Sequence, residues 1–328
     1  MDIAYRRSNK MLPARDHAAR ICTAVASGEA AQSQLVASWS RCIGGYGLDP
    51  MRAQPPHILT AAELRNSVEE MDEILFAARA ALERLHAVSQ GTKACILFAG
   101  QSGILVHSSV PLSDAAELHR LGLHPGVDWN EQTEGTNGIG TCLVEKSPLL
   151  IHKEQHFYER HMSVSCAAAP IFDHVGEIAG ALDVTIYGPD TDGTWPAHMV
   201  SLVAETARQI EIDYFHQKFS AARIISVAGR SSRSGAALLA VDGDDVVVGA
   251  TRGARTALKL TDRQLREGIC ARDLFDNTPD DLSQAERSII RRALVRSKGN
   301  VSAAANLLNI SRATMKRKLA YYDLRKKS

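Results

Sequence analysis

A short stretch near the end of the chain combines residue types that suit contacts with DNA. Its members are Ser311, Arg312, Ala313, Thr314, Lys316, Arg317 and Lys318. Arginine can form paired hydrogen bonds with guanine, and the methyl groups of alanine and threonine can touch thymine. Lysine suits phosphates, which position a protein on DNA without specifying sequence. We therefore expect this stretch to contact double-stranded DNA, with the trailing Arg325, Lys326 and Lys327 also at phosphates.

The charge distribution supports a polyanionic partner. Residues 282–328 hold 12 Lys or Arg and two acids, whereas the whole chain has 38 basic and 37 acidic residues. Residues 1–281 therefore carry 26 bases and 35 acids, a net charge of −9. Each phosphate that a protein neutralises releases condensed counterions, which favours binding by the basic end of the chain.

Three short helices are expected to position these residues. Gly299-Asn300 ends a first helix and begins a second, and Asn309 suits a left-handed turn before Ser311 caps a third. At about 100° per residue, Met315, Leu319 and Tyr322 share one face of the third helix, opposite the DNA-contacting residues. This is the helix-turn-helix pattern. The alternative interpretation is a solvated basic helix on an ordinary helical hairpin.

The same residues carry a family resemblance. The segment GNVSAAANLLNISRATMKRKL resembles the Fis-type helix-turn-helix that ends many bacterial enhancer-binding regulators. Met315 and Lys316 depart from that pattern, which usually has leucine and an aromatic or polar residue there. The departures concern base preference more than fold. Fis-type domains bind DNA as dimers, so the resemblance implies a homodimer here.

The composition is that of an ordinary soluble chain. It has 328 residues, 45% of them hydrophobic and 23% charged. No apolar run reaches the length that spans a membrane, and the first residues lack the apolar core of a secretory signal. The six cysteines are scattered without a CxxC pair, which predicts reduced thiols in the cytoplasm.

A long helix is expected after a capping box formed by Thr60 and Glu63. Its apolar residues follow four-three spacing: Leu64, Val68, Met71, Leu75, Ala78, Leu82 and Leu85. This spacing suits a coiled-coil seam between two copies of the chain. It equally suits a helix that packs on its own domain. Both interpretations stay open.

Residues 93–186 predict an antiparallel sheet with flanking helices. Short apolar runs at 93–99, 103–109, 147–152, 163–173 and 177–188 are typical of strands, with turns between neighbouring runs. A helix is expected at 114–123 and a longer one at 196–218.

The segment WNEQTEGTNGIGTCL, residues 129–143, is rich in glycine but matches neither GxxxxGK[ST] nor GxGxxG. Its glycines therefore indicate close backbone packing rather than a phosphate loop. Together with SCAAAPIFD and GEIAGALDV, it resembles the GAF sensor domain of the acetoin/glycerol catabolism regulator family. That resemblance implies a pocket for a small-molecule effector near Trp129, Glu131, Thr136, Asn137 and Cys166. Each also has a structural interpretation, such as core aromatic for Trp129, turn former for Asn137 and buried small residue for Cys166.

Neither metal binding nor catalysis is favoured. His152, His156, His161 and Cys166 lie close in sequence, but their spacing matches no zinc finger. A redox role for Cys142 or Cys166 needs a lowered thiol pKa, and no motif indicates one. We expect no cofactor, no metal and no enzymatic activity.

Two further segments complete the organisation. The sequence SWSRCIGGYGLDP resembles the region before the sensor domain in the same family, with Trp39 and Cys42 as core or domain-contact residues. Residues 219–281 resemble the opening of a PAS domain and look truncated, with a linker at 277–281. That family normally places an AAA+ ATPase before the Fis-type domain, whereas this sequence has no Walker A loop.

The predicted fold is α+β and multidomain. The expected parts are an N-terminal helical segment (1–59), a GAF-like sensor with dimerisation helices (60–218), a truncated PAS-like unit and linker (219–281) and an all-α Fis-type helix-turn-helix (282–328). The function that this organisation predicts is a ligand-responsive, dimeric transcription regulator that binds specific operators. The alternative is an architectural DNA-binding protein with a vestigial sensor.

Overall fold

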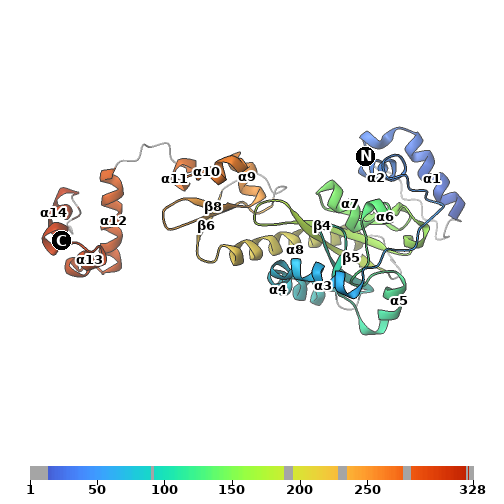
Figure 1. The fold of residues 1–328 in the computed structure, drawn as a ribbon, viewed down its shortest axis with the longest axis horizontal. Coiled ribbons are helices and arrows are strands. Elements are labelled where there is room, and N and C mark those ends of the chain that lie inside the picture. Colours follow the sequence, from blue (N-terminus) through green and yellow to red (C-terminus); the bar gives the residue numbers. More distant parts are fainter. Residues whose placement is uncertain are drawn as a thin grey trace. The chain divides into compact units, whose positions relative to one another are not determined.

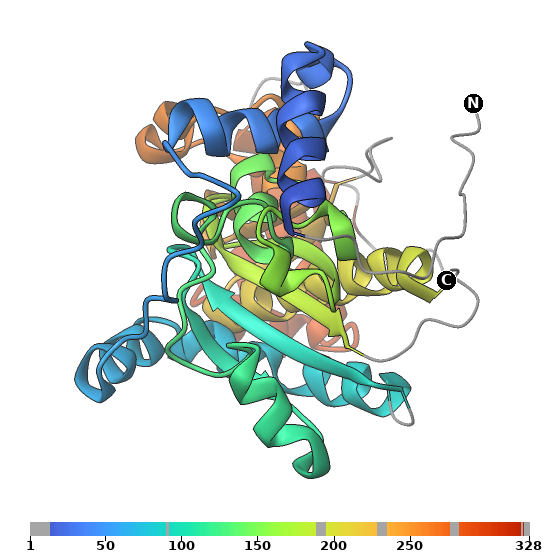
Figure 2. The same cartoon turned by 90° about the vertical axis from the view of Figure 1, so that its right-hand side faces the viewer.

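The computed structural model describes residues 14–89, 92–187, 195–227, 235–275, 282–322 and 324. It divides into two compact units, Met1–Ile269 and Cys270–Ser328, each with hydrophobic clusters of its own. Figures 1 and 2 show the ribbon from two directions. The predicted linker at 277–281 and the basic residues Arg325, Lys326 and Lys327 lie outside the described residues.

The centre of the first unit is a five-stranded antiparallel sheet with strand order β2-β1-β5-β4-β3. Its strands are β1 (Ala94–Gly100), β2 (Leu105–Ser109), β3 (Leu149–His152), β4 (Ser165–Phe172) and β5 (Ile178–Ile186). Every residue of β1 and β4 is buried, because helices cover both faces of the sheet. The prediction of an antiparallel sheet with flanking helices is confirmed.

Two long helices cover one face of this sheet. These are α4 (Asp72–Ser89) and α8 (Trp195–Lys218), which lie side by side in Figure 1. The shared core contains Ile74, Ala78, Leu82 and Leu85 from α4, Met199, Val203, Ala207 and Ile210 from α8, and Ile96, Phe98, Leu182 and Val184 from the sheet. The apolar faces of the two helices therefore pack on the strand side chains that point to this face of the sheet, which are every second residue along each strand.

The predicted continuous helix after Thr60 is two helices. The capping box is confirmed: Glu63 N donates to Thr60 Oγ1 over 3.4 Å, and Thr60 N donates to the Glu63 carboxylate over 2.8 Å. However, α3 (Ala61–Glu70) ends before Met71, and α4 then begins at Asp72. Ala78, Leu82 and Leu85 are buried in the chain's own core, which supports packing within the domain for this half of the spacing.

Shorter helices and the N-terminal segment lie over the other face. The domain's own helices there are α5 (Ala115–Arg120), α6 (Glu131–Glu134) and α7 (Gly138–Glu145). The N-terminal segment forms α1 (Ala14–Ala26), α2 (Gln34–Ser40) and a π-helical turn, Arg41–Gly45. Figure 2 shows α1 and α2 in blue beside the green helices. Trp39 and Cys42 are buried against Phe157 and Tyr158, which confirms them as domain-contact residues.

A three-stranded antiparallel sheet completes the first unit. It comprises β6 (Arg223–Ser226), β7 (Leu238–Val241) and β8 (Val247–Ala250), in that order, followed by α9 (Arg252–Leu258) and α10 (Asp262–Glu267). The expected succession of strand, turn, strand and helix is present. Its relation to a PAS domain stays a prediction.

The second unit contains α11 (Ala271–Phe275) and the three helices expected at the C-terminal end. These are α12 (Leu282–Arg296), α13 (Val301–Leu307) and α14 (Arg312–Tyr321). Ile290, Ala293, Ala304, Ala305, Met315 and Leu319 form their core. The predicted helix caps and turn are confirmed: Asn300 caps α13, Asn309 has φ of +51°, and Ser311 caps α14. None of the helices that the structure describes has the length and apolar character to cross a bilayer.

Candidate functional site

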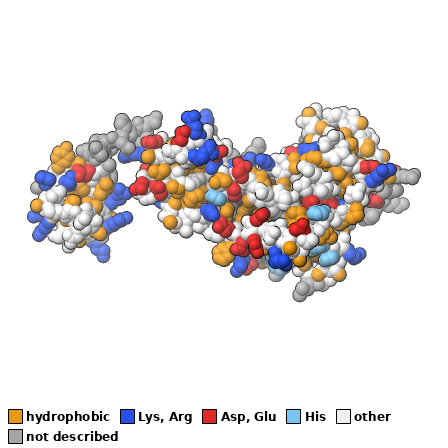
Figure 3. Space-filling view, in the orientation of Figure 1, with side chains coloured by type: hydrophobic (Ala, Val, Ile, Leu, Met, Phe, Trp, Pro, Cys, Tyr) orange, Lys and Arg blue, Asp and Glu red, His pale blue; other side chains and the backbone are white. Residues whose placement is uncertain are grey.

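Helix α14 presents basic side chains on the face opposite its buried residues. Arg312, Lys316 and Arg317 are exposed, whereas Met315 and Leu319 are 0% and 6% exposed. Ser311 Oγ accepts a hydrogen bond from Thr314 N over 3.0 Å and so fixes the start of the helix. Among the predicted residues, Ala313 is also exposed and Thr314 is half-buried. Figure 3 shows Lys and Arg side chains around this three-helix unit.

Lys318 differs from its neighbours. Its ammonium group forms an ion pair with Glu286 on α12, and Tyr322 donates a hydrogen bond to the other carboxylate oxygen over 2.5 Å. This pair joins α14 to α12, a role that the sequence did not indicate. The predicted phosphate contact of Lys318 therefore competes with a contact inside the unit.

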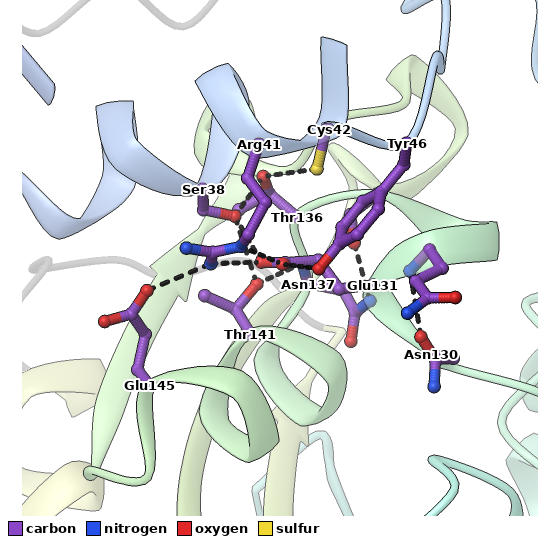
Figure 4. Close-up of polar contacts among 12 residues, drawn as sticks. Ser38, Arg41, Cys42, Tyr46, Asn130, Glu131, Thr136, Asn137, Thr141 and Glu145 are labelled. Atoms are coloured by element: carbon purple, nitrogen blue, oxygen red, sulfur yellow. Dashed lines mark hydrogen bonds and ion pairs between the residues drawn. The ribbon is translucent and has the colours of Figure 1, made fainter. Parts of the chain in front are cut away.

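The first unit contains a dense polar cluster where the N-terminal segment meets α6 and α7 (Figure 4). We call it the Arg41–Glu131 cluster; its members are Ser38, Arg41, Glu131, Thr136, Thr141 and Glu145. Arg41 donates from Nε to Glu131 Oε2 over 2.7 Å and from its terminal nitrogen to Glu131 Oε1 over 3.0 Å. The same terminal nitrogen lies 2.9 Å from Glu145. Glu131 is completely buried, so this paired contact holds a carboxylate away from water.

The hydroxyl groups of the cluster complete the hydrogen bonding of Glu131. Ser38 Oγ donates to Glu131 Oε1 over 2.5 Å and lies 2.6 Å from Thr136 Oγ1. Tyr46 donates more weakly, over 3.5 Å. The π-helical turn brings Arg41 and Tyr46 to the same carboxylate. Single π-helical turns occur frequently at functional sites.

The glycine-rich segment builds the platform beneath this cluster. Asn137 caps α7 by accepting from Gly140 N over 2.8 Å, and its amide donates to Trp129 O over 3.0 Å. Gly140 sits so close to this loop that a Cβ there would lie 2.4 Å from Glu131 N. The prediction that these glycines permit close backbone packing is confirmed.

The residues predicted near an effector are all buried, and they fall into different surroundings. Glu131 and Thr136 contact the N-terminal segment, while Trp129 donates from its indole to Gly122 O over 3.0 Å. Asn137 is a helix cap. Cys166 lies deeper, on β4, with its sulfur 3.5 Å from His156 Nε2 and 3.3 Å from Thr185 Oγ1. Contact of any of them with an effector stays a prediction.

Sequence reasoning missed Arg41, Ser38 and Asp183. The first two belong to the SWSRC segment, whose charged partner lies 90 residues further along the chain. Asp183 lies on the central strand β5, opposite Leu97 on β1 and Ala168 on β4. Thr185 donates to its Oδ1 over 2.5 Å, and Oδ2 has no hydrogen-bond partner among the described residues. Burial raises the pKa of Asp183 to about 7.

The thiols around Asp183 are protonated and therefore poor nucleophiles. Cys95, Cys142 and Cys166 are buried, and desolvation raises the pKa of each thiol above its usual value. Burial also lowers the pKa of His156 to about 4, so this ring is neutral at ordinary pH. A thiol needs a lowered pKa to act as a nucleophile near neutral pH, so these groups do not form a reactive pair.

We expect the stability difference between wild-type protein and Asp183→Asn to change with pH. The Asp183 carboxyl ionises near pH 3.8 when unfolded and near 7 when folded, so the unfolded chain binds fewer protons between these values. Wild-type stability should therefore fall relative to the variant as pH rises from 4 to 7, by up to about 4 kcal/mol, and then level off. Urea denaturation of both proteins at a series of pH values measures it. A flat difference would contradict the raised pKa.

Comparisons with known proteins give a family match for a part of each unit. Residues 63–213 match the family model described as GAF domain, and residues 281–322 match that described as bacterial regulatory protein, Fis family. The acetoin catabolism regulatory protein of Cupriavidus necator is 34% identical over 148 residues, 45% of this chain and 22% of that protein. The acetoin dehydrogenase operon transcriptional activator of Bacillus subtilis is 26% identical over 154 residues, 47% of this chain and 25% of that protein. The aligned segment thus spans a quarter or less of these relatives.

A solved structure supports the fold of the chain. The crystal structure of the Escherichia coli DhaR(N)–DhaL complex contains a chain that superposes with a TM-score of 0.50 at 15% identity. The match covers 78% of this chain and 86% of that one. At this identity the likeness concerns the fold alone.

These findings define the class of protein: a GAF domain joined to a Fis-type helix-turn-helix, an organisation of transcription regulators rather than of enzymes. Two relatives named for acetoin metabolism are thus similar to this chain over less than half of its length.

Proposed function

We propose that this chain is a ligand-responsive transcription regulator that binds specific operators through α14. The observation that carries the proposal is the exposed face of Arg312, Lys316 and Arg317 on a helix whose opposite face, Met315 and Leu319, is buried. A recognition helix contacts base edges mainly through its N-terminal residues, and Ser311 fixes that end here. The output that we propose is DNA binding itself, because residues 214–280, between the two family matches, contain no Walker A sequence.

The signal in this proposal is a small molecule that binds the GAF domain. The names of the relatives make acetoin the first effector to test. We further propose that the chain acts as a homodimer, since two recognition helices one DNA turn apart read two half-sites. An effector would change DNA binding only as far as its affinities for the two arrangements of the dimer differ.

Replacing Arg317 by alanine should weaken binding to a specific operator by roughly tenfold or more, because one paired contact with guanine is lost. Binding to unrelated duplex should change much less, so the ratio of specific to non-specific affinity should fall. Operators are first found by mapping bound sites across the genome. Fluorescence anisotropy titration at fixed salt then measures both affinities.

Two matched variants make this measurement decisive. Lys316→Ala should weaken specific and non-specific binding alike, as expected for a phosphate contact. Arg263→Ala removes the same charge from α10, where Arg263 is 81% exposed and pairs with Glu267 over 3.4 Å, and should leave DNA binding unchanged. If all three variants behave alike, or if wild-type protein prefers no operator over random duplex, α14 does not read sequence and the architectural alternative is favoured.

A further inference from the structure

The interior of the GAF domain contains a carboxyl group that its own fold leaves without a full set of partners. Asp183 is completely buried on β5, the central strand of the sheet. Its Oδ1 accepts a hydrogen bond from Thr185, whereas Oδ2 has none from any described residue. A buried polar atom without a partner costs free energy of about 1–3 kcal/mol. Such an atom in a folded protein requires an explanation.

The surroundings determine which form of the carboxyl is present. Its cross-strand neighbours are Leu97 and Ala168, and no described Lys or Arg contributes to its pKa. Asp183 interacts electrostatically with the thiols of Cys95, Cys142 and Cys166, and these three thiols are uncharged. Burial without a cation favours the neutral acid, which predominates below the pKa of about 7. Because Oδ1 accepts from Thr185, the proton of the neutral acid belongs on Oδ2, which becomes a hydrogen-bond donor.

Helix α7 closes over this donor. A Cβ at Gly138, the first residue of α7, would lie 2.5 Å from Asp183 Oδ2 and 2.5 Å from Cys166 Cβ, so only glycine lets the helix start there. The next turns of α7 carry Thr141 and Glu145, which belong to the Arg41–Glu131 cluster. The same short helix therefore lies on Asp183 with one end and is held to the N-terminal segment by the other.

We propose that Asp183 is the hydrogen-bonding anchor for the effector, and that the effector is a small neutral organic molecule with a carbonyl or hydroxyl oxygen. The proposal rests on the sensing function proposed above for the GAF domain. The ligand oxygen accepts from Oδ2, and its carbon atoms contact the apolar side chains on this face of the sheet, among them Leu97, Trp129 and Ile139. Anions are rejected, because no cation offsets the loss of their hydration. Entry requires α7 to move from its position on the carboxyl.

The test uses four compounds with the same four-carbon size: 2-butanone, 2-butanol, butyrate and sec-butylamine. Thermal unfolding of the full chain is followed with each compound, and isothermal titration gives the affinity of those that stabilise. We expect 2-butanone and 2-butanol to raise the unfolding temperature of the wild-type protein, since a ligand that binds only the folded state stabilises it. We expect no effect of butyrate.

Two variants separate an anchor from a structural residue. Asp183→Leu removes both carboxyl oxygens and keeps a side chain of similar shape, so it should bind 2-butanone at least about tenfold more weakly. Asp183→Asn should retain binding of 2-butanone, since its amide N–H replaces the acid as donor while its oxygen still accepts from Thr185. If Asp183 serves packing alone, neither variant should change the affinity for 2-butanone by more than a small factor.

The outcomes also separate this proposal from the one on which it rests. If the wild-type protein binds 2-butanone and Asp183→Leu binds it equally well, sensing stands but Asp183 is not the anchor. If butyrate or sec-butylamine stabilises the protein and the two neutral compounds do not, the ligand class is wrong. If none of the four binds, the anchor proposal is overturned, while the operator titration still decides the regulator function.

Discussion

Replacing Arg41 by alanine should lower the free energy of unfolding of the GAF unit by about 2–4 kcal/mol. The reason is the carboxylate that the substitution leaves behind: Glu131 is 0% exposed, and among the described side chains only Ser38 and Tyr46 would still donate to it. The Arg41 side chain is 26% exposed, which places the loss below that for a fully buried pair. Urea denaturation followed by circular dichroism measures the loss, and limited proteolysis should cut residues 14–59 sooner than in wild-type protein.

A second arginine of the N-terminal segment provides the matched control. Arg20 pairs with Glu154 over 2.7 Å, but both side chains are 39% exposed. Water screens such a pair, so Arg20→Ala should cost less than about 1 kcal/mol. Adding Glu131→Gln to Arg41→Ala should recover part of the loss, because the buried group is then uncharged. Equal losses for Arg20→Ala and Arg41→Ala would mean that the buried position of Glu131 has no energetic consequence.

The cluster also gives a physical account of why two distant motifs accompany each other in this chain. The SWSRC segment supplies Ser38 and Arg41, and the glycine-rich segment supplies Glu131 and Thr136. Each segment satisfies polar groups that the other buries. The N-terminal segment is thereby fastened to α6 and α7, and α7 in turn lies on Asp183. A ligand that moves α7 would have to strain or break hydrogen bonds of the Arg41–Glu131 cluster. This supports a role for that cluster in the response to an effector.

The sequence was most informative where local chemistry decides the structure. Helix ends followed from short-range hydrogen bonds, as at Asn300, Asn309 and Ser311, and the strands followed from short apolar runs between turns. The buried face of α14 followed from its periodicity, because Met315 and Leu319 lie four residues apart. These features depend on neighbours within a few residues, which is the range that a single sequence describes well.

The sequence was least informative about partners far apart in the chain. Arg41 and Glu131 look like ordinary surface charges until the fold brings them together. Asp183 stands between Leu182 and Val184, an alternation typical of a strand with one face in water. Here both faces of the sheet are covered, so the polar position is inside. The four-three spacing from Leu64 to Leu85 was ambiguous for a similar reason, since one apolar stripe suits either a second chain or the domain's own sheet.

Gly140→Ala should be the most damaging single substitution in the glycine-rich segment, with a loss of about 3 kcal/mol or more. The added Cβ would lie 2.4 Å from Glu131 N and 2.6 Å from Trp129 O. Both neighbours are backbone atoms, so no side-chain rotation relieves the contact, and α7 must move away from α6. That movement would separate Thr141 from Ser38 and strain the Asn137 cap, so the substitution should weaken the Arg41–Glu131 cluster without removing any of its members.

Gly44→Ala is the control for this substitution. Gly44 lies in the π-helical turn, is exposed, and has no atom within 4 Å of an added Cβ. Alanine there should leave stability unchanged or raise it by about 0.5–1 kcal/mol, because glycine loses more conformational freedom on folding. Urea denaturation of both variants measures the change in the free energy of unfolding. It compares Gly140, which is in close contact with backbone atoms, with Gly44, which faces open space. If Gly140→Ala proves as mild as Gly44→Ala, α7 can leave its position at little cost, and the fit between α6 and α7 does not hold the N-terminal segment in place.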